Sequence, residues 1–337
     1  MVDIRALRFL GNGRSEVTEI EKPNLQEGMI LVQVMSSAFC GSENKAYFSD
    51  SINLVAGVKG HEAAGIVIDE QNTQFHIGDH VVIQIMDGCG QCYFCKKGLY
   101  QFCSSLKYKS GTHAQYIVLP EKCVVAAPKD IPFDILVLLG GDTVGVAYRA
   151  VKQIDVLERK TVFVSGGGPI GLGVTTLLHY LGCTVLVSEP SAYRRDYLIK
   201  HAGAAKVLDP KNEYWKEQIL DLTEGIGPEF VFECSGNPEA QIQALELVRC
   251  QGTVVFCGEN YNGLSIIPSV HIIHKEVTVK GAFYFSPEDF LQIIQLYRKG
   301  LDVSSLVSHI VPLDQAPRMM EQFTQGRTGK VIIHPQE

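Results

Sequence analysis

A glycine-rich turn between an apolar run and an amphipathic stretch constrains this chain more than any other feature of its sequence. The letters GGGPIG at residues 166–171 follow the strand-like run Thr161–Ser165. One glycine of such a turn makes a tight bend, the next lets the backbone approach a ligand, and the last packs helix on strand. The free amides of the following helix then attract a pyrophosphate. The cofactor contacts predicted here are those of Gly166, Gly168, Pro169, Ile170 and Gly171.

Six short apolar runs follow one another between residues 161 and 280, separated by longer amphipathic stretches. This alternation is the pattern of βαβ units, and six parallel strands make a complete dinucleotide-binding sheet. The sequence therefore predicts an α/β protein with a Rossmann domain, a doubly wound parallel sheet. Its predicted strands are Thr161–Ser165, Thr184–Ser188, Lys206–Leu208, Phe230–Glu233, Thr253–Cys257 and Thr278–Lys280.

An acidic residue at the end of the second predicted strand indicates which dinucleotide binds. Glu189 is placed to accept hydrogen bonds from the adenosine ribose, and its charge repels the 2'-phosphate of NADP, so NAD is predicted. Arg194 and Arg195 keep NADP open, because arginines here either accommodate that phosphate or lie on a solvated helix face. Four residues at later strand ends are predicted to meet the rest of the coenzyme: Cys234, Gly258, Ala282 and Phe283.

The first part of the chain has a different pattern, with short apolar or alternating runs broken by Gly, Pro and Asp, which predicts a partly open barrel or sandwich. A helix at Pro287–Lys299 and a strand at Gly329–His334 are expected to follow the parallel sheet, and the strand to rejoin the first part. A chain of 337 residues is long enough for two domains, and a cleft between domains often holds a site. The runs are Ile30–Met35, Gly65–Asp69, Asp79–Ile85 and Ala114–Leu119.

Four of the ten cysteines lie within fifteen residues: Cys89, Cys92, Cys95 and Cys103. Four thiolates from one loop close a tetrahedral shell and leave no open position. They predict a structural zinc that orders a lobe at about residues 86–104 and does no chemistry. The remaining cysteines are scattered and no secretory leader is visible, which favours a reducing, cytoplasmic setting.

A catalytic zinc needs an open position, and therefore only about three protein ligands of mixed type. Cys40 and His61 are the best candidates outside the four-cysteine loop, and each follows a turn-prone or strand-end segment. Either residue taken alone would more often belong to a protein core.

Several motifs of this chain resemble those of the zinc-containing medium-chain dehydrogenases and occur in the same order along the sequence. This family includes alcohol, polyol, formaldehyde and threonine dehydrogenases. The resemblance covers essentially the whole chain. It implies a GroES-like catalytic domain at residues 1–149, a Rossmann NAD-binding domain at 150–284, a return segment at 285–337, and a homodimer or homotetramer. The matching segments are Cys40–Ser42, Gly60–Glu62, the four-cysteine loop, Gly111–Tyr116, the glycine turn and Gly329–Ile332.

The resemblance assigns Cys40 and His61 to the catalytic zinc and implies a third ligand at the start of a helix. One alignment puts Asp142 at that position, where an aspartate could equally be a helix N-cap. A competing ungapped alignment puts Gly140 there, which cannot ligate through a side chain. Glu62 is implied as an exchangeable fourth ligand or as a hydrogen-bond acceptor behind the ligands.

The resemblance also suggests catalytic roles beside the metal. Ser42 matches the hydroxyl that accepts the substrate proton, and Glu43 matches an acid that is expected to orient a ligand histidine. Lys45 stands where many relatives carry the histidine that passes the proton to water. Lysine could be a relay only if its surroundings made it more acidic, so relay, contact with an anionic substrate group and simple exposure all stay open.

The sequence predicts an oxidoreductase that uses zinc and NAD to transfer a hydride between the coenzyme and a secondary alcohol or ketone. Polyols, sugars, cyclitols and amino alcohols are the expected substrates, and Ser42, Lys45 and Glu62 the expected catalytic residues. The alternatives are an NADPH-dependent carbonyl reductase and a noncatalytic dinucleotide-binding protein. A net charge of -7 and interspersed acids and bases argue against nucleic acid, and no apolar run reaches the ~18 residues of a membrane span.

Overall fold

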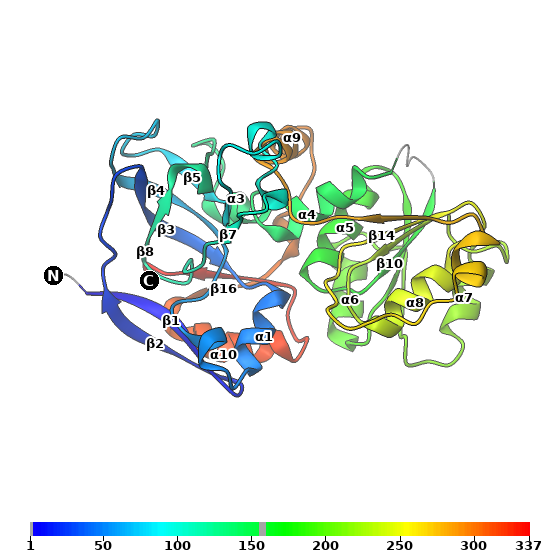
Figure 1. Cartoon of the computed structure of the whole chain (residues 1–337). Coiled ribbons are helices and arrows are strands. Elements are labelled where there is room, and N and C mark those ends of the chain that lie inside the picture. Colours follow the sequence, from blue (N-terminus) through cyan, green and yellow to red (C-terminus); the bar gives the residue numbers. More distant parts are fainter. Residues whose placement is uncertain (1–2, 155–159) are drawn as a thin grey trace. The chain divides into compact units, whose positions relative to one another are not determined.

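The computed structural model describes residues 3–154 and 160–337, which fold into two compact units (Figure 1). The first unit consists of Met1–Asp142, Phe285–Ile294 and Val307–Glu337. The second consists of Thr143–Tyr284 and Gln295–Leu306. The chain thus completes its first unit only after it has built most of the second.

A seven-stranded sheet forms the framework of the first unit, with β8 paired to β3 beside the strand order β16-β17-β3-β4-β5-β9. All four runs predicted in this part contribute strands, and the predicted last strand, β17, pairs antiparallel with β3 through Ile332 and Ala38. The last strand of the chain thus pairs with a strand from its first part. The strands are β3 (Met29–Ala38), β4 (Glu62–Glu70), β5 (His80–Ile83), β8 (Tyr116–Pro120), β9 (Val124–Ala126), β16 (Val307–Pro312) and β17 (Lys330–His334).

Sequence reasoning missed an antiparallel hairpin at the start of this unit. It is formed by β1 (Asp3–Gly11) and β2 (Arg14–Glu21), joined at Asn12 and Gly13, which have φ values of 51° and 73°. Asn-Gly is the strongest short-range hairpin signal, because both residues tolerate positive φ. The signal was present, but every second residue of β2 is only half-buried, so the apolar alternation that marks a strand is weak there.

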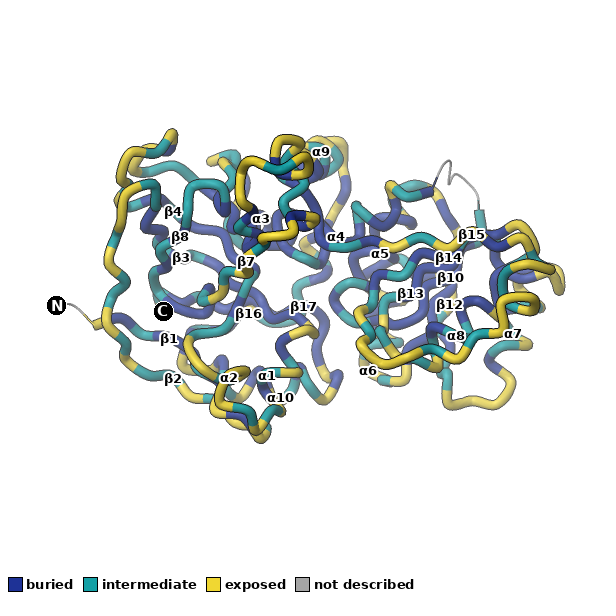
Figure 2. Tube along the Cα trace, in the orientation of Figure 1, coloured by how far each residue is buried: buried dark blue, intermediate teal, exposed yellow. Residues whose placement is uncertain are grey.

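The core of the first unit packs α10 (Ala316–Thr324) against the sheet. Phe39 of the segment after β3 meets Phe323 of α10 with ring centroids 5.8 Å apart, and both side chains are buried. Ile333 of β17 is fully buried in the same cluster. Figure 2 shows that β3 and β17 are mostly buried, whereas β2 is intermediate or exposed along its length.

The second unit is a six-stranded parallel sheet in the order β12-β11-β10-β13-β14-β15. All six predicted strands are found, although β14 ends one residue early, at Phe256, and β15 extends to Gly281. The strand order reverses between β10 and β13, and open α/β sheets bind ligands at such a switch point, outside the carboxyl ends of the strands. The strands are β10 (Thr161–Ser165), β11 (Thr184–Ser188), β12 (Lys206–Leu208), β13 (Phe230–Glu233), β14 (Thr253–Phe256) and β15 (Thr278–Gly281).

Helices complete the second unit, whose core includes Phe163 of β10 and Trp215 of α7 with ring centroids 6.0 Å apart. The predicted helix near the end of the chain, α9, spans Pro287–Arg298. No helix among the described residues is long and apolar enough to cross a membrane. The helices of this unit include α5 (Pro169–Tyr180), α6 (Ala192–His201), α7 (Trp215–Asp221) and α8 (Pro238–Leu247).

Ile333→Ala tests how strongly β17 holds the first unit together. Ile333 is fully buried, so the truncation should lower the free energy of unfolding by about 2–5 kcal/mol. Ile310→Ala on the adjacent strand β16 is the matched control, because Ile310 is 49% exposed and its truncation should cost less than about 1 kcal/mol. Urea unfolding followed by fluorescence measures both, and equal losses would contradict a core centred on β17.

Candidate active site and coenzyme site

Four potential metal ligands converge in the first unit. Cys40 follows β3, His61 and Glu62 stand at the start of β4, and Asp142 is the first residue of α4 (Asp142–Val151). One ligand atom from each of the four lies within 4.8 Å of the ligand atoms of the others. Residues separated by about a hundred positions thus meet, and they offer sulfur, nitrogen and oxygen donors together.

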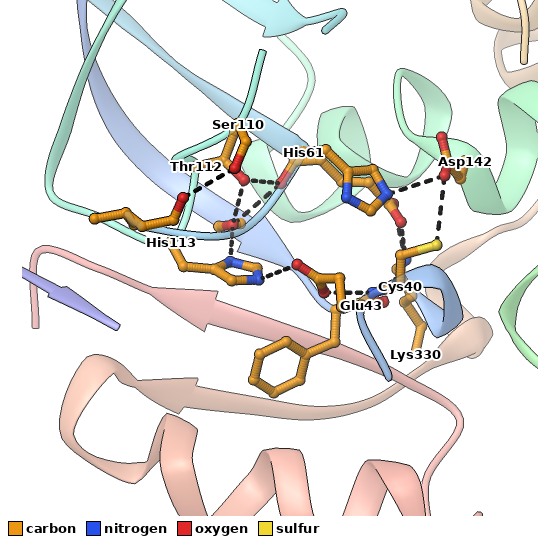
Figure 3. A network of polar contacts seen from close by, with 12 residues as sticks. Cys40, Glu43, His61, Ser110, Thr112, His113, Asp142 and Lys330 are labelled. Carbon is orange, nitrogen blue, oxygen red and sulfur yellow. Dashed lines mark hydrogen bonds and ion pairs between the residues drawn. The ribbon is translucent and has the colours of Figure 1, made fainter. Parts of the chain in front are cut away.

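Asp142 contacts both Cys40 and His61 (Figure 3). Its Oδ2 atom is 3.4 Å from the Cys40 Sγ atom and 3.1 Å from the His61 Nε2 atom. The Oδ1 atom of Asp142 is buried and has no hydrogen-bond partner in the described part of the chain. A buried carboxylate oxygen without a partner is costly, and a bound cation would satisfy it.

The competing alignment places the third ligand at Gly140, which has no side chain that could bind a metal. A Cβ atom on Gly140 would lie 2.7 Å from Val82, so this residue packs against β5 and has no side chain to offer. A side chain on Gly141 would collide with the Glu62 carboxylate. The structure therefore brings Asp142, and not its glycine neighbours, to Cys40 and His61.

The charges of the cluster favour a cation. Burial raises the pKa of the Cys40 thiol, and the Asp142 carboxylate raises it further. Burial alone would raise the pKa of Asp142, but His61 outweighs it and the pKa of that carboxyl is lowered. Burial also works against a charged imidazole, but Cys40 and Asp142 together raise the pKa of His61 well above its usual value. The mixed donor set of sulfur, nitrogen and oxygen suits zinc.

Glu62 is held by a buried lysine that sequence reasoning did not single out. Lys330 Nζ lies 2.7 Å from both carboxylate oxygens of Glu62 and donates to the Phe39 carbonyl at 2.9 Å. Both charged side chains are 0% exposed. Burial raises the pKa of Glu62 to about 7, although Lys330 opposes the shift. The glutamate therefore has a partner of its own behind the cluster.

Glu43 orients the site in a different way from the expected one. Its carboxylate does not bond to His61 but accepts hydrogen bonds from the Cys40 amide at 3.0 Å and pairs with His113 Nε2 at 2.9 Å. The other ring nitrogen of His113 lies 2.7 Å from the Ser37 hydroxyl. Burial would raise the pKa of Glu43, but His113 outweighs it and the pKa is lowered. This buried network fixes the turn that carries Cys40, and only the local sequence around His113 hinted at it.

Ser42 and Lys45 lie in the short turn and the short helix that follow Cys40. Ser42 is exposed in a 3-10 turn, Gly41–Glu43, directly after Cys40. Lys45 is exposed in α1 (Asn44–Phe48). Ser42 and His61 both line a cavity of about 190 Å³, whose wall does not include Lys45.

The four clustered cysteines form a second, separate group of donors. The sulfur atoms of Cys89, Cys92, Cys95 and Cys103 all lie within 4.8 Å of one another. A Cβ atom on Gly88 would be 2.6 Å from the Cys95 sulfur, and Gly90 and Gly98 have φ values of 78° and 69°. These glycines let the loop fold back on its own thiols, as the spacing predicts. Four sulfur donors from one loop fit a closed zinc shell.

The glycine turn has the geometry predicted for it. Gly166 has a φ of 96°, and Gly168 is the N-cap of α5, with Pro169 at its first turn. A Cβ atom on Gly171 would collide with the Gly166 carbonyl, whereas a Cβ atom on Gly168 would have only the Arg194 guanidinium, 4.0 Å away, within reach. The turn thus has open space at Gly168 and a tight backbone contact at Gly171. The remaining predicted residue of the turn, Ile170, is half-buried in α5.

Glu189 closes this turn from the end of β11. Its buried carboxylate accepts hydrogen bonds from the Gly167 amide at 2.8 Å and from the Ser191 amide at 2.7 Å. The two arginines differ: Arg195 donates to the Glu189 and Pro190 carbonyls and pairs with Asp209, whereas Arg194 extends toward Gly168. Burial lowers the pKa of Arg194, and Glu189 opposes this shift.

The other predicted coenzyme residues lie at the ends of parallel strands. Cys234 follows β13, and Gly258 comes two residues after β14. A Cβ atom on Gly258 would collide with the Gly236 amide, so the backbones are in direct contact there. Ala282 donates its amide to the Phe256 carbonyl at 2.9 Å, and Phe283 follows it half-buried. All four thus stand at the edge where such sheets bind ligands.

Comparison with known proteins agrees with this architecture. Residues 26–129 match the Alcohol dehydrogenase GroES-like domain family, and residues 169–299 match the Zinc-binding dehydrogenase family. L-threonine 3-dehydrogenase of Pyrococcus furiosus is 30% identical over 95% of this chain and 94% of its own length. The enzyme of that name from Caldanaerobacter subterraneus is 30% identical over 95% of both chains.

Solved structures show the same fold. The alcohol dehydrogenase of Thermus sp. ATN1 superposes with a TM-score of 0.88 at 25% identity, covering 98% of this chain and 99% of that one. Galactitol-1-phosphate dehydrogenase of Escherichia coli gives 0.87 at 23% identity, covering 98% and 100%. The chain belongs to the zinc-containing medium-chain dehydrogenase/reductase family, as its motifs predict. It is therefore an oxidoreductase of the dehydrogenase type.

Lys330→Met tests the buried pair behind the cluster. The variant leaves the Glu62 carboxylate without its ammonium, so the free energy of unfolding should fall by about 3–5 kcal/mol. Adding Glu62→Gln should restore part of the loss, because a neutral amide is cheaper to bury. Lys160→Met is the control, because that lysine is 43% exposed in its pair with Glu229 and should cost less than about 1 kcal/mol. A single Lys330 variant as stable as this control would refute the interpretation.

Two alanine substitutions in the glycine turn should separate folding from binding. Gly171→Ala should lower the free energy of unfolding by about 1–3 kcal/mol, because its Cβ atom meets backbone. Gly168→Ala should unfold like the parent but bind NADH more weakly, because the methyl group occupies the space needed by the pyrophosphate. Thermal unfolding and NADH fluorescence titration measure the two effects, and unimpaired binding by Gly168→Ala would contradict the predicted pose.

Proposed function

We propose that this protein is a zinc- and NAD-dependent dehydrogenase of secondary alcohols, with a polyol, sugar, cyclitol or amino alcohol as substrate. The observation that carries the proposal is the convergence of Cys40, His61 and Asp142, with a buried oxygen of Asp142 left unsatisfied. Dehydrogenases of threonine, galactitol 1-phosphate and simple alcohols among its relatives support this substrate range.

The proposed domains correspond to the two units except at residues 143–149 and 295–306, which belong to the second unit. Residues 1–149 and the return segment 285–337 form the catalytic domain, and residues 150–284 form the NAD-binding domain. Oligomers of two or four chains are proposed from the family alone. A cytoplasmic location is proposed because none of the ten cysteines, all of them among the described residues, is in a disulfide bond.

Cys40, His61 and Asp142 are the proposed ligands of a catalytic zinc, and Cys89, Cys92, Cys95 and Cys103 are the proposed ligands of a structural zinc. Bound at the first site, zinc would supply the Lewis acid that makes a substrate hydroxyl acidic, while NAD would accept the hydride. Glu62 is proposed as an exchangeable fourth ligand, because its carboxylate is paired with Lys330 when it does not bind the metal.

Side chains of this protein would carry the proton of the substrate hydroxyl toward water. Ser42 lines the cavity next to His61, and its hydroxyl is the proposed acceptor of the proton that leaves the substrate. Lys45, one turn further along α1 and exposed, is proposed as the next group on the way to water or as a contact for an anionic substrate group. The buried pair of Glu43 and His113 would keep the turn that carries Cys40 and Ser42 in place throughout.

NAD is the proposed coenzyme because the Glu189 carboxylate is buried directly beneath the glycine turn. Both of its oxygens already hold backbone amides, so its negative charge is fixed where the adenosine ribose is expected. Arg194, which extends toward Gly168, is the residue that would contact a 2'-phosphate if NADP were preferred. Gly166, Gly168, Pro169, Ile170 and Gly171 are the proposed pyrophosphate contacts, and Cys234, Gly258, Ala282 and Phe283 the proposed contacts of the nicotinamide half.

Zinc content and turnover test this proposal together. The parent should contain about two zinc ions per chain and reduce NAD with at least one alcohol, in a screen over polyols, aminocyclitols, hydroxy amino acids and sugar phosphates. His61→Ala should lose one zinc and all turnover, whereas Cys92→Ser should lose one zinc but keep the reaction at low temperature, because its site only orders a lobe. One zinc in the parent and no turnover with NAD or NADP would favour a noncatalytic protein, and strict use of NADP would refute the role of Glu189.

A further inference from the structure

The cavity beside the cluster carries an unusual charge for a pocket that is meant to hold a neutral alcohol. It has a volume of about 190 Å³ and shares Ser42 and His61 with the proposed active site. Its wall also includes two cations, Lys59 and Lys109, and one acid, Glu43, together with Ile85 and Ser110. All of these residues belong to the first unit, so the cavity is complete within it.

Of the two lysines in the wall, Lys59 is better placed to bind an anionic group. Its side chain is half-buried, and Nζ donates to the Ala56 carbonyl at 2.5 Å. Among the residues that the structure describes, it forms no ion pair with a carboxylate. Glu43 attracts it across the cavity, but the oxygens of that carboxylate already bind His113 and the Cys40 amide. The ammonium therefore has room for a further, negatively charged partner.

Lys109 adds positive charge rather than cancelling it. Its Nζ atom pairs with Asp87 Oδ2 at 3.0 Å, while Lys122 takes the other oxygen of the same carboxylate at 2.7 Å. One acid thus serves two ammonium groups, so these three side chains together carry a net positive charge beside the cavity. Positive charge here attracts an anion.

Ser110 shows where the wall of the cavity extends beyond His61. Ser110 donates to the Val58 carbonyl at 2.9 Å, which holds its oxygen beside Lys59. In Figure 3, Ser110 lies on one side of His61 and Asp142 on the other. An anionic group bound here would therefore be separated from the reacting hydroxyl, which suits a substrate several atoms long.

We propose that this cavity binds an anionic group of the alcohol substrate, a phosphate monoester or a carboxylate, and that Lys59 is its principal contact. The inference rests on the proposed dehydrogenase function and narrows its substrate to anionic alcohols. It also moves the anion contact from Lys45, which does not line the cavity, to a lysine two residues before His61. Sequence reasoning gave Lys59 no role.

Paired substrates test the inference. Galactitol 1-phosphate is compared with galactitol, and L-threonine with L-threoninol, for the parent, Lys59→Met, Lys59→Arg and the control Lys129→Met. Lys129 is 63% exposed and lies outside the cavity wall. The parent should prefer the anionic member of one pair, and Lys59→Met should lower kcat/KM for that member by about tenfold or more, while the neutral member is unchanged. Lys59→Arg should restore most of the loss, and Lys129→Met should behave as the parent.

The two pairs distinguish the source of the charge, since preference in the first indicates a phosphate and preference in the second a carboxylate. Equal loss for both members of a pair in Lys59→Met, or no preference in the parent, would overturn the inference, and turnover of the neutral member would leave the proposed function standing. Titration of the zinc-loaded protein with inorganic phosphate, followed by calorimetry, gives a readout without turnover. Binding should be about tenfold weaker in Lys59→Met than in the parent and Lys59→Arg, and identical binding in all variants would also overturn the inference.

Discussion

The site depends on one buried ion pair, between Lys330 and Glu62. The ammonium reaches both oxygens of the carboxylate and the Phe39 carbonyl from β17, the strand that ends the chain. Neither charge reaches water, so each is tolerable only because the other is present. The pair therefore requires that the last strand lie beside β3, and it ties the residue next to His61 to a segment more than two hundred positions away. The local geometry around the proposed metal ligands therefore depends on the pairing of β17 with β3, which completes the first unit.

A second buried network supports the cluster from the other side. The Glu43 carboxylate accepts a hydrogen bond from the Cys40 amide and pairs with His113. The other ring nitrogen of His113 is hydrogen-bonded to the Ser37 hydroxyl of β3. The two networks meet at Ser37, whose Oγ atom lies 3.1 Å from the Glu62 carbonyl oxygen, and both fix backbone that carries a proposed ligand. The proposed ligands thus stand on supported backbone, and their ligand atoms lie within 4.8 Å of one another, close enough for one cation to contact all of them.

Sequence reasoning succeeded where the chemistry is local. Positive φ at Gly166 and the sulfur spacing of the four-cysteine loop are set within a few residues, and alternating apolar runs identify six parallel strands without knowledge of their order. Asp142 required the resemblance to a family, because an aspartate at a helix start is ambiguous by itself. Lys330, His113 and Lys59 were not found, since their significance comes from partners that only the folded chain brings near. The first hairpin was missed for the opposite reason, because its Asn-Gly turn is local but its strands alternate weakly.

The packing of Gly140 and Gly141 has a consequence for how this site can evolve. Neither glycine can gain a side chain, because the first faces Val82 and the second faces the Glu62 carboxylate. The backbone path to position 142 is thus fixed by its neighbours, while the side chain at that position is limited only by what can reach Cys40 and His61. A single-codon change at Asp142 could exchange an oxygen donor for another kind without disturbing the scaffold. Metal preference in such a lineage would be free to drift at one position, whereas the fold around it would stay under strict selection.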